Sequence, residues 1–233
     1  NGPCVELGDS ADNRMRATAW PQTGWEGLHY GAGLPVKVLR DVLIWAARCC
    51  IRVVGLWPNM VDLFADVDRV VPITDKRWVY SHLSILTPDG IRRIRDLGLM
   101  VTTHTNRYIW KEGGKLRDRV GRAHENDIVP LRSLLEAGIP VTLATDNVPP
   151  SLFHPIWHVN ARIERSAGAC IAPEQRLTRL EALRCGSYNG AFLTFEENDK
   201  GSIETGKLAD MVVTSADLLM VDPSLLRHIV VDT

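Results

Sequence analysis

The pattern of hydrophobic and polar positions changes at Pro35. Residues 1–34 are rich in Gly, Asp, Asn and Trp and show no regular period, so we expect irregular structure there. From Val36 to Cys50, apolar residues recur every three to four positions, which predicts an amphipathic helix. The β-branched run Ile51–Leu56 that follows predicts a short strand.

The same alternation of helix and strand then repeats along the chain. Periodic apolar positions predict helices over residues 61–70, 91–96, 128–137 and 180–185, and short apolar runs predict strands over 78–83, 99–104, 140–146 and 209–213. Thr87 and Pro88 are residue types favoured at the N-cap and first position of a helix, and Gly98 and Gly138 are typical helix ends.

Strands that alternate with helices indicate right-handed crossovers and a parallel sheet, hence an α/β fold. A complete (β/α) barrel needs eight such units and typically about 250 residues. Only four units can be recognised in these 233 residues. The pattern therefore fits either half of a (β/α) barrel or a small doubly wound sheet.

Composition narrows the class of protein. Hydrophobic residues make up 45% and charged residues 24%, as in ordinary globular domains, and the net charge is -1 with no basic face. We therefore expect neither nucleic acid nor a membrane as partner. The five cysteines include the adjacent pair Cys49–Cys50 and show no CxxC spacing, which favours a reducing, cytoplasmic compartment. No apolar stretch approaches the roughly 20 residues that cross a bilayer.

Three polar residues end predicted strands: His82, His104 and Asp146. Active sites of parallel α/β proteins lie at the carboxyl ends of the strands, where these side chains would converge. Imidazole is a common ligand of divalent metals, and an aspartate can bind a metal or accept a proton from metal-bound water. The alternatives are hydrogen-bonded structural histidines and an aspartate that caps the turn at residues 147–150.

The loop over residues 106–115 follows a strand end and could close over a substrate through Arg107 or Trp110, although a plain surface loop is the alternative. His154 and His158 have the i, i+4 spacing of a helical metal site. Pro155 lies between them and no Glu accompanies them, so the zincin motif is absent. We expect both histidines in a loop or on a helix surface.

Several segments resemble the amidohydrolase superfamily, and within it amidohydrolase family 3. Residues 130–141 followed by Thr145-Asp146 resemble the last helix and strand of its barrel, and residues 177–184 its helix after the barrel. Residues 200–213 are similar to the segment G-S-I-x-x-G-K-x-A-D-x-V-V, which returns from the barrel to a small β-sandwich. Arg77–His82 resembles the strand that ends in a metal-binding histidine.

The resemblance covers roughly residues 35 to 232. It implies an irregular segment over 1–34, the carboxy-terminal part of a TIM-type (β/α) barrel over 35–198, and a return segment toward a β-sandwich over 199–233. It also implies a hydrolase of non-peptide carbon–nitrogen bonds in a small-molecule substrate, with one or two divalent metals, most often zinc. His82 and Asp146 would bind the metal and Asp146 would shuttle the proton; His104, Arg107 and Trp110 are the candidate substrate contacts.

The chain also departs from the family pattern. It has no His-x-His pair, and Leu56 stands about where a further metal histidine is expected. A catalytically inactive homologue that serves as a binding or assembly module is therefore the second interpretation. A doubly wound binding protein is a third, weakened because no GxGxxG or P-loop follows a strand. A half-barrel exposes apolar edges, so we expect the isolated chain to dimerise or aggregate.

Overall fold

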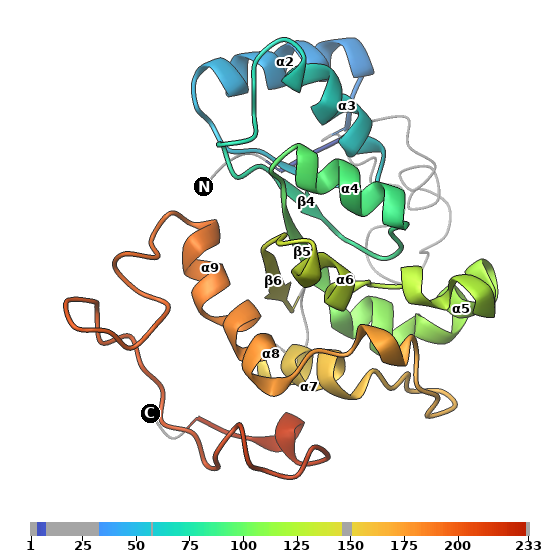
Figure 1. Ribbon diagram of the computed structural model, residues 1–233, viewed down its shortest axis with the longest axis vertical. Helices are drawn as coiled ribbons and strands as arrows, with labels where there is room; N and C mark the ends of the chain where they lie inside the picture. The colour runs from blue at the N-terminus through green and yellow to red at the C-terminus, as the bar shows by residue number, and fades with distance from the viewer. Residues whose placement is uncertain (1–3, 8–32, 57, 146–150, 232–233) are drawn as a thin grey trace, which may run out of the picture. The chain divides into compact units, whose positions relative to one another are not determined.

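The computed structural model describes residues 4–7, 33–56, 58–145 and 151–231 (Figure 1). The chain divides into two compact units. The first comprises Asn1–Ser81 with Asp96–Leu99, and the second comprises His82–Arg95 with Met100–Thr233. The boundaries near residues 34 and 198 that the resemblance implies remain predictions.

The described residues of the first unit form four short parallel strands. These are β1 (Cys4–Leu7), β2 (Gly33–Leu34), β3 (Val54–Leu56) and β4 (Val79–Ser81), in the order β2-β1-β3-β4. Strands β1 and β2 both lie within residues 1–34, which we expected to be irregular, and for the residues of these two strands the expectation was wrong. Four residues are too few to establish a period in the sequence, and β1 is held by parallel pairing with β3, where Cys4 lies opposite Val54.

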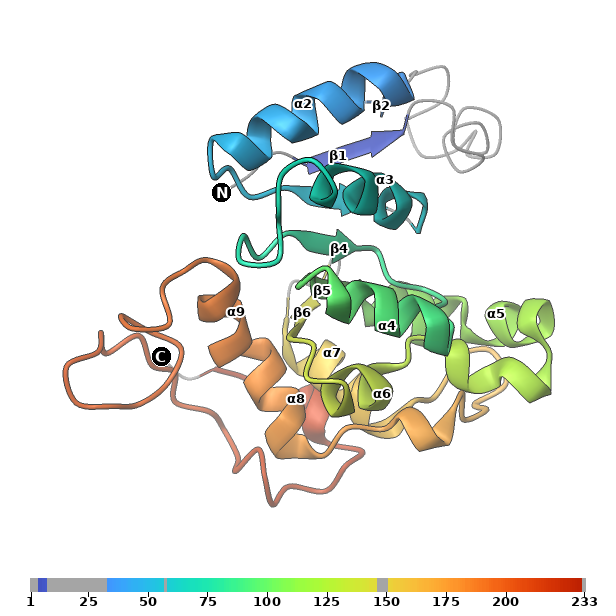
Figure 2. The same ribbon diagram turned by 45° about the horizontal axis from the view of Figure 1, so that its top comes forward.

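Two amphipathic helices accompany these strands, α2 (Val36–Arg48) and α3 (Asn59–Asp68), shown beside β1 and β3 in Figure 2. Helix α2 buries Leu39 and Leu43, whereas Trp45 on its other face is 63% exposed. Phe64 of α3 packs edge-to-face on Trp78 with ring centroids 4.9 Å apart. The predicted helix is confirmed, and Leu43 and Ala46 are buried as their spacing predicted. Val38 and Val42, which the same spacing placed on the buried face, are 48% and 43% exposed.

The second unit contains the parallel pair β5 (Met100–His104) and β6 (Val141–Ala144), in register from Val101↔Val141 to His104↔Ala144. Around them lie the helices α4 (Pro88–Asp96), α5 (Gly113–Val120), α6 (Leu131–Glu136), α7 (Phe153–Ala161), α8 (Arg179–Gly186) and α9 (Tyr188–Leu193). Four short turns complete the unit: η1 (Asn106–Lys111, π-helical) and the 3-10 turns η2 (Arg122–Asp127), η3 (Pro173–Gln175) and η4 (Leu226–His228). The strands alternate with helices, so the α/β prediction is confirmed.

A buried arginine holds the loops of the second unit together. Arg162 is fully buried, and its guanidinium donates to the carbonyls of Ile128 at 2.7 Å, Val129 at 3.1 Å, Ile171 at 2.6 Å and Gln175 at 3.4 Å. Burial lowers the pKa of Arg162 to about 9. The carbonyls replace the water that a buried cation loses, so the guanidinium remains the charged donor that joins these segments at neutral pH.

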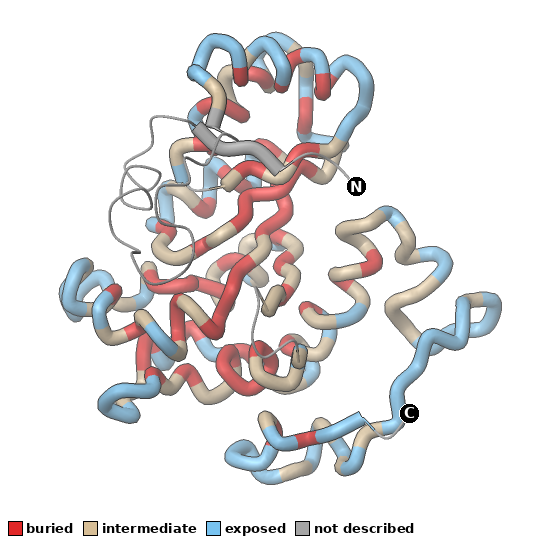
Figure 3. Tube along the Cα trace, turned by 180° about the vertical axis from the view of Figure 1, so that it is seen from behind, coloured by how far each residue is buried: buried red, intermediate tan, exposed pale blue. Residues whose placement is uncertain are grey.

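The chain toward the carboxy terminus forms little regular structure. We expected a strand at residues 209–213, but this stretch is irregular, and Figure 3 shows that the chain near this end is largely exposed. Met211, Val212 and Val213 are 59%, 62% and 60% exposed. A strand needs a neighbour for its backbone groups, and no strand in the described part of the chain pairs with this stretch.

None of the helices in the described ranges has the length and apolar character needed to span a lipid bilayer.

Candidate functional site

The candidate site lies in the second unit, where the segment after β4 meets the end of β5. His82 has a φ of +60°, a left-handed backbone conformation that residues other than glycine seldom adopt. The N–H of the next residue, Leu83, donates to the carbonyl of Thr102 in β5 at 3.4 Å. The sharp turn at His82 is thus fixed against β5, and such strained positions cluster at functional sites.

This turn brings two of the three predicted strand-end residues together. The ring centroids of His82 and His104 are 4.3 Å apart, with an interplanar angle of 51°. His104, the last residue of β5, is only 9% exposed. The third candidate, Asp146, lies outside the residues that the structure describes.

Tyr108 joins this pair and was not foreseen from the sequence. Its hydroxyl oxygen lies 3.2 Å from Nδ1 of His82, and its ring centroid lies 6.5 Å from that of His104. The side chain is 2% exposed and comes from η1, the turn that follows β5. Tyr108 follows His104 by four residues. This spacing would have indicated the contact only if residues 106–111 had been recognised as helical.

Arg107 and Trp110, the predicted substrate contacts, belong to the same turn rather than to an open loop. Nε of Arg107 lies 3.1 Å from Oε1 of Glu112, and its guanidinium carbon lies 5.2 Å from the centroid of the Tyr108 ring. The Arg107 side chain remains 29% exposed. Trp110 packs on Trp157 of α7, with ring centroids 5.3 Å apart. Arg107 thus lies against Tyr108, the residue that contacts His82, whereas Trp110 anchors the turn to α7.

His158 is buried in α7, which corrects the expectation of a loop or surface residue. It is 1% exposed, and its Nδ1 lies 3.3 Å from the hydroxyl oxygen of Thr105. Burial, with further contributions from His154 and Arg227, lowers the pKa of His158 to about 3. Pro155 does not interrupt α7, because it lies in the first turn, where its missing N–H costs no helical hydrogen bond.

The donor set of the site fits a divalent metal only in part. Two imidazoles, from His82 and His104, lie side by side. Within the described ranges, however, no group of three or more His, Cys, Asp or Glu side chains is placed to hold a metal ion. Catalytic zinc sites use three protein ligands and keep the fourth position for water or substrate. The described residues thus supply part of such a site.

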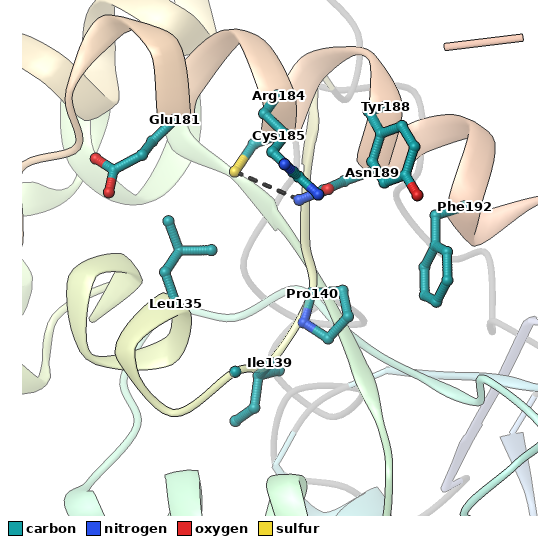
Figure 4. Close-up of a pocket in the computed structure, with 10 residues that line it drawn as sticks. Leu135, Ile139, Pro140, Glu181, Arg184, Cys185, Tyr188, Asn189 and Phe192 are labelled. Atoms are coloured by element: carbon teal, nitrogen blue, oxygen red, sulfur yellow. Dashed lines mark hydrogen bonds between the residues drawn. The ribbon is translucent and has the colours of Figure 1, made fainter. Parts of the chain in front are cut away.

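A pocket of about 360 Å³ lies elsewhere in the second unit, at the amino end of β6, between α6, α8 and α9 (Figure 4). The polar side chains that line this pocket form hydrogen bonds with other parts of the chain. The carboxylate of Glu181 accepts from the Arg132 guanidinium at 2.6 Å, and the Asn189 amide donates to the carbonyl of Val141 at 2.8 Å. Burial raises the pKa of the Cys185 thiol to about 12, so this thiol is inert as a nucleophile.

Comparison with protein families gives a match to the amidohydrolase family over residues 55–233. The chain is 33% identical over 199 residues to the N-substituted formamide deformylase of Arthrobacter pascens, which covers 81% of this chain and 36% of that enzyme. It is 29% identical over 136 residues to the imidazolonepropionase of Streptococcus sanguinis, covering 58% of this chain and 28% of that protein.

Solved structures share the fold. An uncharacterized metal-dependent hydrolase from Pyrococcus horikoshii superimposes with a TM-score of 0.68 at 17% identity, over 84% of this chain and 41% of that one. An adenosine deaminase from Xanthomonas campestris, which contains bound zinc, gives a TM-score of 0.57 at 19% identity, over 84% of this chain and 45% of that one. The chain therefore spans less than half of the length of each of these relatives.

Proposed function

Because the chain belongs to the amidohydrolase family, we propose that it forms part of a metal-dependent hydrolase of non-peptide carbon–nitrogen bonds in a small molecule. The observation that carries this proposal is the contact between His82 and His104, whose rings lie 4.3 Å apart at the ends of neighbouring chain segments. The A. pascens relative is a formamide deformylase, an enzyme of this reaction class. The chain matches 36% of that relative, so the complete reaction belongs to the proposal.

In this proposal His82 would hold a divalent metal, zinc being the first choice, through its Nε2 atom. Asp146 would hold the same metal and would pass a proton from water to the leaving nitrogen. When bound, the metal supplies Lewis-acid activation of a water molecule near neutral pH. Asp146 then acts as general base and general acid, which a carboxylate at the metal can do because it alternates between acceptor and donor.

The surrounding side chains would orient the substrate. His104 is 9% exposed and its ring lies 4.3 Å from that of His82, so in this proposal it forms part of the wall beside the metal ligand. The Arg107 side chain is 29% exposed, so its guanidinium can be reached by a polar substrate group. Trp110 supports the turn that carries Arg107.

The second candidate function is that of an inactive homologue that binds a small molecule or a protein without catalysis. Two observations favour it. By the resemblance, Leu56 stands about where a further metal histidine is expected, and fewer than three potential ligands are grouped within the described ranges. Two protein ligands hold zinc weakly, so this chain would need additional groups to reach a tight site.

Metal analysis separates the two candidates. The protein is purified without chelator and its metal content measured by plasma mass spectrometry, together with His82→Ala and Asp146→Asn. His124→Ala is the matched control, because His124 is exposed and lies outside the site. We expect about one zinc, manganese or iron per chain in the wild type and control, and loss in both site variants. Metal-free wild-type protein would exclude the hydrolase and leave the binding module.

The proposal also includes a cytoplasmic location for the protein. Cys49, Cys50, Cys170 and Cys185 are free thiols, which is compatible with the reducing cytoplasmic location that we propose.

A further inference from the structure

The contact between Tyr108 and His82 gives Tyr108 a role that its packing alone does not require. We infer that Tyr108 is a positioning residue for His82: it accepts a hydrogen bond from Nδ1–H and so keeps Nε2 unprotonated, the form in which Nε2 would be able to hold a divalent metal. The inference rests on the proposed function, in which Nε2 of His82 is a metal ligand. It starts from the distance of 3.2 Å between the Tyr108 hydroxyl oxygen and Nδ1 of His82.

The direction of this hydrogen bond decides what His82 can bind. A neutral imidazole carries one hydrogen, so one ring nitrogen donates and the other accepts, whereas a phenol hydroxyl can do either. If Nδ1–H donates to Tyr108, Nε2 carries no hydrogen and is the acceptor atom of the ring. If the phenol donates instead, Nε2 carries the hydrogen and cannot bind a metal. Histidine ligands of metals are commonly held through their other ring N–H in this way.

Tyr108 is well placed for the task because its ring is immobilised. It is 2% exposed, and the Arg107 guanidinium covers one face of the ring at 5.2 Å, itself restrained by Glu112. The turn that carries Tyr108 is pinned at its start, where the buried Thr105 contacts His158. The turn is π-helical, a geometry that recurs at functional sites.

His82 itself needs such a partner. With a φ of +60°, its backbone is held in an uncommon conformation, so the direction of its Cα–Cβ bond is fixed by the turn. The rotation of the ring about that bond is not fixed by the backbone. The hydrogen bond to Tyr108 on one nitrogen and the contact with the His104 ring at 4.3 Å together define the ring plane.

The first measurement is the tautomer of His82, by long-range proton–nitrogen NMR at a pH where imidazole is neutral, in metal-free protein. We compare the wild type with Tyr108→Phe and with Tyr188→Phe, which removes a phenol hydroxyl far from His82 along the chain. We expect the ring hydrogen on Nδ1 in the wild type and control, and a shift toward Nε2–H in Tyr108→Phe. A wild-type ring protonated on Nε2 overturns the inference, and this result needs no folded variant.

The second measurement is zinc affinity, by competition with a chromophoric chelator. We expect Tyr108→Phe to weaken zinc binding about 10- to 100-fold, Tyr188→Phe to leave it unchanged and His82→Ala to abolish it. Unchanged affinity in Tyr108→Phe, with loss in His82→Ala, overturns the role of Tyr108 and leaves the proposed function standing. Equal affinity in the wild type and His82→Ala removes the proposed function, while the tautomer still decides whether Tyr108 orients His82.

Discussion

At the scale of single residues, the buried His158 makes the free energy of unfolding depend on pH. It contacts Thr105, at the start of the turn that carries Tyr108. It is 1% exposed and its pKa is lowered to about 3, first by burial, whereas the ordinary value is 6.5. The His158 imidazole therefore binds a proton below pH 6.5 in the unfolded chain, but only near pH 3 in the folded chain. Stability from this residue is fully present above pH 6.5 and is lost as the pH falls through that window.

We predict that the free energy of unfolding falls by about 2 kcal/mol more in the wild type than in His158→Asn between pH 7.5 and pH 5. The asparagine cannot titrate but keeps a polar atom near the Thr105 hydroxyl, which isolates the proton uptake. The measurement is urea unfolding at both pH values. If the free energy of unfolding depends on pH equally in the two proteins, His158 takes up its proton in the folded chain over the same pH range as in the unfolded chain, which would contradict the prediction.

The sequence predicted that two histidines of the candidate site would lie together, but it did not predict the residues that support them. His82 and His104 were expected to converge because both end strands, and the structure places their rings 4.3 Å apart. Tyr108 could not be found, since a six-residue π-helical turn leaves no periodic pattern. The burial of His158 was missed because a histidine was taken for a polar surface residue, although the surrounding Ile156, Trp157 and Val159 are buried.

At the scale of elements, helix α8 shows how local chemistry fixes a boundary. The Thr178 hydroxyl accepts from the N–H of Glu181 at 3.3 Å, and the Glu181 carboxylate accepts from the N–H of Thr178 at 2.8 Å. This reciprocal capping box satisfies two backbone donors that the helix leaves open. Arg132 from α6 binds the same carboxylate at 2.6 Å, so the cap also ties two helices together.

We predict that Thr178→Ala lowers the free energy of unfolding by about 1 kcal/mol, the usual cost of losing an N-cap hydroxyl. Thr178→Ser is the control, because serine keeps the hydroxyl and caps as well as threonine. Urea unfolding of the three proteins provides the comparison. Equal loss in the alanine and serine variants would mean that the Thr178 methyl group, not the cap, stabilises α8.

Other boundaries depended on backbone geometry that the sequence shows poorly. Thr87 was predicted to cap α4, and its hydroxyl accepts from the N–H of Gly90 at 3.2 Å. Helix α6 begins only at Leu131, three residues later than predicted, because Val129 has a φ of +44°. A left-handed residue cannot continue a helix, and the apolar pattern carries no sign of it.

At the scale of the whole molecule, two features of the sequence predicted the fold. One is the alternation of helices and strands, and the other is the segment over residues 200–213 that resembles the family pattern. The family match over residues 55–233 and the TM-score of 0.68 with a metal-dependent hydrolase establish a partial (β/α) barrel. One exception is the expected strand at residues 209–213, whose apolar side chains remain exposed. Propensity alone cannot make a strand, because a strand exists only with a partner to pair with.

These exposed apolar side chains lead to a prediction about assembly. Ile203 is 87% exposed, Leu208 61% and Met220 79%, all in the tail that follows α9. A single exposed apolar residue is ordinary, but a run of them along one segment favours contact with another surface. We therefore expect the purified chain to self-associate with rising concentration, as dimers or larger aggregates, through this tail.

Light scattering coupled to size-exclusion chromatography, over a series of protein concentrations, tests this expectation. Ile203→Ser combined with Met211→Ser should shift the protein toward a monomer, because each change removes apolar area from the contact. Leu180→Ser is the control, since Leu180 is 68% exposed but stands on α8, outside the tail. A wild-type monomer at every concentration would contradict the prediction. An equal shift in the control variant would mean that exposed apolar area in general, rather than this tail, drives association.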